Sequence, residues 1–177
     1  AGAQGGELIG ARYAAVELDY TTWDDGGHLF GPSVSLNVPS SIKGLDLGIS
    51  ARYGDGGVDD IDMNEVGGDV YGVYYSKLSG FTPYLRGSIG YARAKAEYLG
   101  NSASETSFTY SIGAGVEVPL TEKASLDLHV AYSDASNVDE GDSIDMGLGL
   151  NYAISEKISL RVGYSRDFDN DANTVTG

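Results

Sequence analysis

The histidines and the serines near them are the residues that could support nucleophilic catalysis. His129 shares one face of an alternating segment with Asp127, Ser125 and Ser133. Serine, histidine and an acid are the parts of a hydrolase triad. Side chains at i and i+2 on one strand stand ~7 Å apart, however, so the spacing favours a histidine hydrogen-bonded to a carboxylate. His28 lies in a short hairpin without a partner that the sequence identifies, and we predict no catalytic residue.

Two acidic segments repeat the pattern Asp-x-Asp-x-Asn, whose alternating oxygens begin many calcium loops. Neither segment completes an EF-hand, because the sixth position is Glu65 in the first and Thr174 in the second, where glycine is needed. We therefore expect solvated loop charge, with a weak calcium site as the alternative. The candidate ligands are Asp60, Asp62, Asn64, Asp169, Asp171 and Asn173.

The composition excludes several classes of protein. The 177 residues include 26 acidic and 11 basic side chains, and the formal net charge of -15 has the wrong sign for a nucleic-acid surface. Cysteine is absent, which excludes disulfides, thiol catalysis and thiolate metal sites. Glycine is abundant at 26 residues with only 4 prolines, and 13 tyrosines argue against disorder. We expect one domain over residues 1–177 and no cofactor.

Apolar and polar residues alternate along most of the chain, which is the pattern of β-strands. In residues 30–38, for example, Phe30, Val34 and Leu36 oppose Ser33 and Ser35. No segment has helical periodicity, and no run of 18 apolar residues predicts a transmembrane helix. Nine strands are predicted: 10–23, 30–38, 45–53, 69–78, 81–97, 108–120, 125–133, 144–152 and 158–165.

The predicted connections alternate between short turns and longer polar loops. The short turns are 39–43, 78–80, 121–123 and 155–157, and the longer loops are 55–68, 98–105 and 136–142. The connection 24–28 is short, although it lies at the same end of the predicted meander as the longer loops. This asymmetry predicts an antiparallel up-and-down meander like that of outer-membrane barrels, with turns in the periplasm and loops outside.

The composition of the polar face indicates whether the apolar face points outward or inward. A soluble lipocalin-like barrel would carry its apolar face inside. Here the polar face is mostly glycine, serine and alanine, which suit a crowded lumen, and the apolar face places aromatic rings toward the strand ends. Such rings form the girdles of membrane barrels. They are Tyr20, Tyr53, Phe81, Tyr91, Phe108, Tyr132, Tyr152 and Tyr164. We therefore predict a transmembrane all-β barrel with the apolar face toward lipid.

The segments 84–91 (YLRGSIGY), 112–118 (IGAGVEV) and 158–164 (ISLRVGY) resemble small outer-membrane β-barrel proteins. This is the porin-like superfamily that includes the OmpA transmembrane domain and OmpX. The resemblance covers about residues 8–177 and implies a fold and a bacterial outer-membrane location, with little about activity. Residues 1–7 then form a periplasmic N-terminal segment that looks like a mature N-terminus.

The C-terminal end departs from this family, whose members end in a strand that closes on an aromatic residue. Residues 174–177 look instead like the opening of a further strand. Bacterial barrels have an even number of strands. We therefore predict a ten-stranded type whose closing strand is missing after residue 177, with an eight-stranded barrel as the alternative.

Charged residues on the polar face are predicted to line the lumen. If ion pairs brace the barrel wall, Arg86 and Glu117 on neighbouring strands are a candidate pair. Seven acids against three arginines favour a hydrated lumen that prefers cations, with Asp127 and Glu117 facing water. The alternative is a dry interior braced by ion pairs. The predicted lumen residues are Glu17, Asp19, Asp46, Arg52, Arg86, Glu117, Asp127, His129, Asp145, Arg161 and Asp167.

Three cations follow girdle tyrosines on the lipid-facing parity: Arg93, Lys95 and Arg166. At the outer headgroup level they would meet lipopolysaccharide phosphates, which arginine and lysine bind well. The alternative is ordinary snorkelling. The lipid bilayer and lipopolysaccharide are therefore the expected partners, with cations at the acidic loops; no nucleic-acid partner is expected.

The sequence predicts a small barrel with a narrow hydrated lumen that is a passive channel for small solutes or cations. The first alternative is a structural or surface-recognition barrel without transport. The second is a barrel enzyme acting on lipid or peptide, which the sequence supports least because no catalytic constellation is present.

Overall fold

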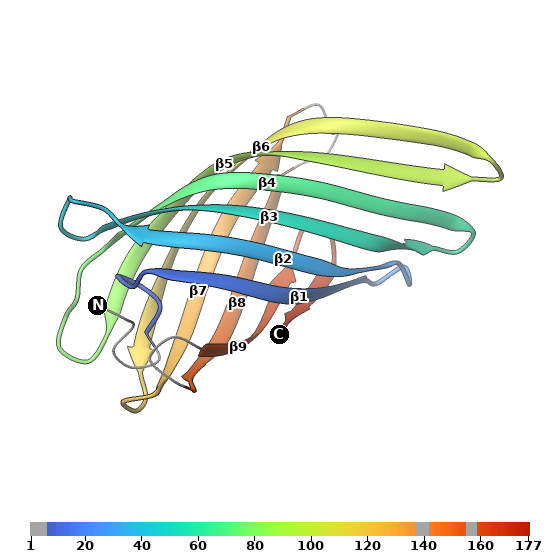
Figure 1. The fold of residues 1–177 in the computed structure, drawn as a ribbon. Coiled ribbons are helices and arrows are strands. Elements are labelled where there is room, and N and C mark those ends of the chain that lie inside the picture. The colour runs from blue at the N-terminus through green and yellow to red at the C-terminus, as the bar shows by residue number, and fades with distance from the viewer. Residues whose placement is uncertain (1–6, 137–141, 155–158) are drawn as a thin grey trace.

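The alternating segments of the sequence become β-strands in the computed structural model, which describes residues 7–136, 142–154 and 159–177 (Figure 1). Ten antiparallel strands close into a barrel, so the ten-stranded prediction is confirmed and the eight-stranded alternative is wrong. The strands are β1 Tyr13–Trp23, β2 His28–Pro39, β3 Leu45–Val58, β4 Ile61–Tyr75, β5 Thr82–Tyr98, β6 Asn101–Pro119, β7 Ala124–Ala135, β8 Asp142–Ala153, β9 Ser159–Asp167 and β10 Ala172–Thr176.

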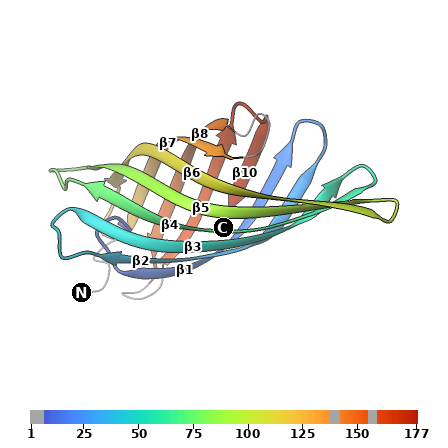
Figure 2. The same ribbon diagram turned by 90° about the horizontal axis from the view of Figure 1, so that it is seen from above.

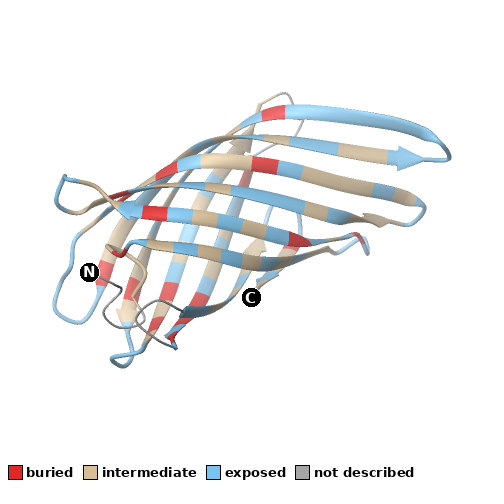
Figure 3. Cartoon of the chain, viewed as in Figure 1, coloured by how far each residue is buried: buried red, intermediate tan, exposed pale blue. Residues whose placement is uncertain are grey.

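The apolar face points outward, as predicted. Large apolar side chains in mid-strand are strongly exposed, among them Val16, Ile49, Ile89 and Ile112, and all eight predicted girdle aromatics are exposed as well. Buried side chains are few and mainly polar, so the core of this protein is its polar interior (Figure 3). An outward apolar surface is stable only against lipid. Among the described residues, no helix is long and apolar enough to cross a membrane.

The strands follow one another around the barrel, and β10 closes the circle between β9 and β1 (Figure 2). The tenth strand is short: its partners run from Thr176 opposite Asp19 to Ala172 opposite Trp23. Gly177 extends this ladder by bonding to Leu18 through both backbone groups. The prediction that the closing strand is missing after residue 177 is wrong, because the five residues of β10 pair with both β9 and β1 and complete the ring of hydrogen bonds.

The strands extend further at one end of the barrel than at the other. The prediction of residues 55–68 and 98–105 as loops is therefore wrong. Residues 55–68 and 98–105 belong mostly to strands, because β3–β4 and β5–β6 continue as hairpins to tight turns at Asp59–Asp60 and Leu99–Gly100. We call this the loop end; the turn end carries residues 40–44, 76–81 and 120–123. Figure 1 shows the two hairpins extending far past the other strands. Most of the predicted loop 136–142 and the predicted turn 155–157 lie outside the described residues.

Inward glycines make room for large rings inside the barrel. A Cβ at Gly115 would clash with the Tyr84 ring, and one at Gly48 would clash with the Tyr71 ring. The small polar face predicted from the sequence is therefore what allows tyrosines to cross the lumen.

Candidate functional site

The N-terminal segment enters the turn end of the barrel and is held there by two buried carboxylates. The backbone N–H groups of Leu8 and Ile9 donate to the two carboxylate oxygens of Glu117, at 2.8 and 3.0 Å. The N–H of Gly10 donates to Asp46 Oδ2 at 2.8 Å. Glu117 and Asp46 are each 1% exposed. The peptide segment thus donates three N–H groups to both oxygens of Glu117 and to one oxygen of Asp46. The other oxygen, Asp46 Oδ1, is buried without a hydrogen-bond partner among the described residues.

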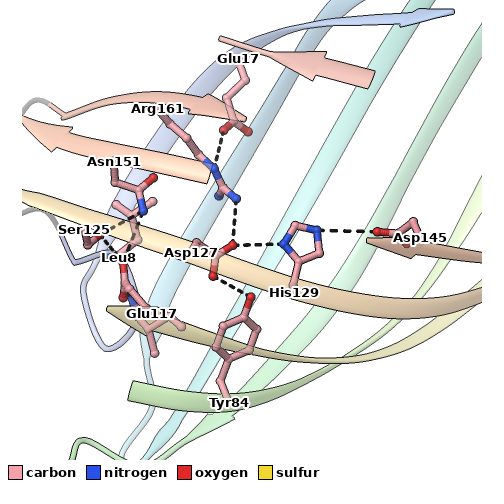
Figure 4. A network of polar contacts seen from close by, with 11 residues as sticks. Leu8, Glu17, Tyr84, Glu117, Ser125, Asp127, His129, Asp145, Asn151 and Arg161 are labelled. Carbon is pink, nitrogen blue, oxygen red and sulfur yellow. Dashed lines mark hydrogen bonds and ion pairs between the residues drawn. The ribbon is translucent and has the colours of Figure 1, made fainter. Parts of the chain in front are cut away.

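Side chains from three further strands, β2, β7 and β8, complete this attachment. Ser125 Oγ donates to Glu117 Oε1 at 2.8 Å, and Asn151 Nδ2 donates to the same oxygen at 3.4 Å (Figure 4). Asn37 Nδ2 donates to the carbonyl of Ala11 at 2.8 Å and to Asp46 Oδ2 at 3.0 Å. Buried polar groups that are satisfied in this way fix the chain rigidly. The turn end of the lumen is therefore crossed by the segment Leu8–Ala11, which we call the strap.

A second polar network crosses the middle of the lumen around Asp127. Its carboxylate accepts a hydrogen bond from Tyr84 Oη at 2.8 Å, and its Oδ2 lies 3.2 Å from His129 Nδ1 and 3.5 Å from Arg161 Nη2. Arg161 Nε lies 3.8 Å from Glu17 Oε1 on the opposite side. Figure 4 shows these side chains converging from several strands. The network joins β1, β5, β7 and β9 across the interior.

His129 lies between two acids, whereas the sequence favoured a hydrogen bond to one carboxylate. Its Nε2 lies 3.6 Å from Asp145 Oδ2, opposite the contact with Asp127. Ser125 bonds to Glu117 and Asn151. The Ser-His-Asp triad considered from the sequence is therefore not assembled around His129. His129 thus lies in the lumen, hydrogen-bonded to the Asp127 carboxylate.

The predicted pairing of Arg86 with Glu117 is wrong. The register places Glu117 opposite Thr82, and Arg86 opposite Gly113. The Arg86 guanidinium lies over the Tyr71 ring instead, 4.2 Å from its centroid, in a cation–π contact. Glu117 and Asp127 were also predicted to face water, yet they are 1% and 7% exposed. The strap and the lumen tyrosines pack around these carboxylates and cover them.

The remaining predicted lumen charges lie toward the loop end. Arg52 pairs with Glu65 at 2.7 Å, and Asp19 accepts a hydrogen bond from Thr176 at 2.7 Å. Asp167 lies at the rim, where its carboxylate accepts the N–H groups of residues 169 and 170 and so holds the β9–β10 turn. All of these groups have specific partners.

Among the described residues, two of the cavities inside the barrel lie on either side of the Asp127 network. One of about 120 Å³ lies among the strap, Glu117 and Asp127, and one of about 310 Å³ lies toward the loop end beside Glu17, Asp19 and Arg52. The side chains that line both are Tyr13, Tyr71, Arg86, His129 and Arg161. The cavities are thus separated by side chains and not by a wall of backbone.

The predicted calcium ligands form no metal cluster. In the second segment, Asp169 accepts the N–H of Ile144, Asp171 lies 3.4 Å from Arg166, and Asn173 accepts the Tyr164 hydroxyl. In the first segment, Asp60 lies in the β3–β4 turn, and residues 62 and 64 lie on β4. Across the described parts of the chain, no three His, Asp or Glu side chains are arranged to hold a metal ion.

The three basic residues predicted to bind lipopolysaccharide lie on two different strands. Arg93 and Lys95 lie on β5, while Arg166 lies on β9. Lys95 pairs with Glu97 at 3.0 Å, and Arg166 lies 3.8 and 3.4 Å from Asp24 and Asp171. Within the described residues, Arg93 is the one of the three without an ion pair.

Sequence reasoning missed several residues that build the interior. Tyr13, Tyr71 and Tyr84 fill the lumen, and Asn37 and Asn151 hold the strap region. All five alternate with lipid-facing residues, so the two-residue period already placed them inside. The sequence analysis did not include them because it predicted only ionisable side chains as lumen site residues.

The outward apolar face, the closed ten-stranded sheet and the polar interior define an outer-membrane β-barrel. Residues 1–144 match the family model described as "Outer membrane protein beta-barrel domain", and the chain belongs to this family. No curated protein matches the sequence. The barrel is therefore a protein of the bacterial outer membrane, as the sequence predicted.

Solved structures share the fold at low sequence identity. Neisserial surface protein A has a TM-score of 0.50 and 16% identity, with 92% of each chain covered. The translocator domain of the autotransporter NalP from Neisseria meningitidis has a TM-score of 0.54 and 13% identity, covering 94% of this chain and 85% of that one. At such identities the likeness concerns the barrel architecture.

Proposed function

We propose that the protein is a surface-recognition barrel, with an interior closed to solutes and an extended β-sheet presented outside the cell. The observation that carries the proposal is the contrast between its ends. Buried carboxylates bind the strap at the turn end, whereas the β3–β4 and β5–β6 hairpins extend freely at the loop end. A conducting pore needs a continuous wet path, which the strap and the Asp127 network oppose.

The orientation follows from the family and from charge. Outer-membrane barrels place their short turns in the periplasm. Lys43, Lys77 and Lys123 lie in or beside the short turns, and acids crowd the opposite end. A cysteine in place of Asp59 should therefore react with an impermeant label on intact cells, and one in place of Lys123 should not. The reverse labelling pattern would contradict the orientation.

Electrical recording in planar bilayers tests the closed interior. The wild-type barrel should give no sustained conductance across a KCl gradient. Steady single-channel openings from correctly folded protein would overturn the proposal, because the strap and the Asp127 network would then fail to close the lumen.

The second candidate is the narrow channel for small solutes or cations, which one observation favours. The two interior cavities share five lining side chains, so side-chain movement alone could join them. Acids outnumber arginines in the lumen, and acidic rings favour cations. A reversal potential showing cation preference in the same recording would support this candidate.

A further inference from the structure

Strand β6 is paired on both sides along only part of its length. Its partner β5 accompanies it to the tip of the hairpin, where Tyr98 lies opposite Asn101. On the other side, pairing with β7 begins at Thr109 opposite Ala135. Residues 101–107 thus have a paired edge toward β5 and, among the described residues, an unpaired edge on the other side. Figure 1 shows this part of β6 as the margin of the extended sheet.

The backbone groups on this free edge can be identified from the first residue beyond it. Phe108 donates its N–H to Ser136 Oγ at 3.1 Å, and its carbonyl accepts the N–H of Ser136 at 2.8 Å. Both backbone groups of Phe108 therefore point away from β5. Because this direction alternates along an antiparallel strand, Ser102, Ser104 and Thr106 also point their N–H and C=O groups to the free edge. No described residue bonds to them there.

Glu105 is the one charged side chain in this segment, and the stronger protections of a sheet edge are absent from it. Natural sheets cover exposed edges or place lysine, proline or a bulge on them. Residues 101–107 contain none of these residues, and 101–106 are all exposed. The segment measures about 23 Å at the rise of an extended strand. It is a long, flat template of hydrogen-bonding groups carried on small side chains.

We propose that this edge of β6 binds an extended peptide segment of a partner protein by strand addition, an inference that rests on the proposed recognition function. Strand addition takes its affinity from main-chain hydrogen bonds, which matches an edge whose unpaired groups are backbone groups. A seven-residue strand aligned with residues 101–107 would satisfy the six free groups.

Charge identifies the chemistry of that strand. The protruding sheet, residues 53–68 and 91–107, carries the acids Asp55, Asp59, Asp60, Asp62, Glu65, Glu97 and Glu105 against the bases Arg93 and Lys95. This surplus favours a strand flanked by lysine or arginine. It also opposes the pairing of two copies of this chain edge to edge, since like charges would then face each other.

The experiment uses the full chain in detergent micelles and a synthetic peptide, acetyl-Lys-Thr-Val-Thr-Val-Thr-Lys-amide. In an NMR titration, the amide signals of Ser102, Ser104 and Thr106 should shift and their hydrogen exchange should slow. A peptide with glutamate at both ends should bind at least about threefold more weakly, because the sheet repels it.

Two variants of one residue separate backbone from side-chain recognition. Ser104→Pro removes a free-edge N–H that pairs with no described residue, and it should weaken peptide binding at least about tenfold. Ser104→Ala keeps that N–H and should bind within about twofold of wild type. Circular dichroism should show the same strand content in both variants.

Three results would overturn the inference: no shift with the lysine peptide, equal weakening by both Ser104 variants, or concentration-dependent dimers that account for the shifts without peptide. Conductance recorded on the same preparation separates this inference from the proposed function. A silent barrel that fails to bind peptide contradicts strand addition alone. A conducting barrel that binds peptide contradicts the closed interior and leaves the strand site standing.

Discussion

The two ends of the barrel use the same kinds of groups in opposite ways. At the turn end, Glu117 and Asp46 are buried, and backbone N–H groups of the strap donate to them. At the loop end, Glu97 is exposed and Glu65 is partly exposed, and β6 has N–H groups that no described residue accepts. The net negative charge thus has two distinct structural roles, one internal and one external.

The difference between the two ends shows how burial changes what a carboxylate contributes to stability. A buried charge is stable only when several donors surround it, and it then fixes whatever supplies those donors. An exposed charge is solvated and contributes little to stability, but it acts on approaching molecules through the surface field. Mutations of similar residues at the two ends should therefore have unequal effects.

The largest effect is expected at Glu117. Glu117→Ala leaves the buried N–H groups of Leu8 and Ile9 without their acceptor, and should cost on the order of 3 kcal/mol of unfolding free energy. Glu65→Ala is the matched control, because it breaks an exposed ion pair worth less than about 1 kcal/mol. Urea titration of the folded barrel in micelles measures both, and equal losses would contradict the comparison.

A smaller effect is expected at Tyr84. Tyr84→Phe keeps the ring that fills the lumen and removes the hydrogen bond to Asp127, so the unfolding free energy should fall by about 1 kcal/mol. Tyr110→Phe removes a tyrosine–Asp134 hydrogen bond near the loop end and is the control. Tyr110 is exposed, so its replacement should change stability less. If the two variants were equally destabilised in the same urea titration, the middle of the lumen would not be the tight network described above.

A change of the opposite sign is expected at the tip of the β5–β6 hairpin. Leu99 is 80% exposed and has a φ of 47°, a left-handed conformation that asparagine adopts more readily than leucine. Leu99→Asn should therefore stabilise the hairpin by roughly 0.5 kcal/mol or more. Asp59→Asn, at a φ of 51°, already has a tolerant residue and should change little. Amide exchange near each tip measures the gain, and slower exchange only at the Asp59 tip would be the contrary result.

The smallest effect is expected in lipid binding. Arg93 is free of ion pairs within the described part of the chain, whereas Lys95 and Arg166 are already neutralised by acids. Arg93→Ala should reduce co-purified lipopolysaccharide by about twofold, since a free cation binds phosphate better than a paired one. Lys95→Ala should reduce it less. A phosphate assay of the purified barrel measures the lipopolysaccharide bound to each variant. Unchanged lipid in both variants would favour plain snorkelling.

The sequence predicted the membrane-spanning part of the fold well because lipid imposes a strict two-residue period. Val34, Ile49 and Ile112 must face outward, so their neighbours must face inward, and the girdle aromatics mark the ends. Outside the membrane this constraint ends. Residues 55–68 and 98–105 form strands without apolar alternation, and their polar composition was therefore interpreted as loop.

The interior was predicted in composition but not in contacts. The period placed Asp127, His129 and Arg161 inside, and the structure brings them together. The pairing of Arg86 with Glu117 failed because it depends on strand register, which composition does not encode. The strap was missed for a further reason: its contacts use the backbone of residues 8–10, and backbone groups have no signature in a sequence.

Hydrogen exchange of single amides tests the contrast between the two ends most directly. The account predicts slow exchange for the amides of Leu8, Ile9 and Gly10, which donate to buried carboxylates. It predicts fast exchange for the amides of Ser102, Ser104 and Thr106, although all three lie within a strand. Fast exchange in the strap together with protection along the β6 edge would contradict both the closed turn end and the open strand edge.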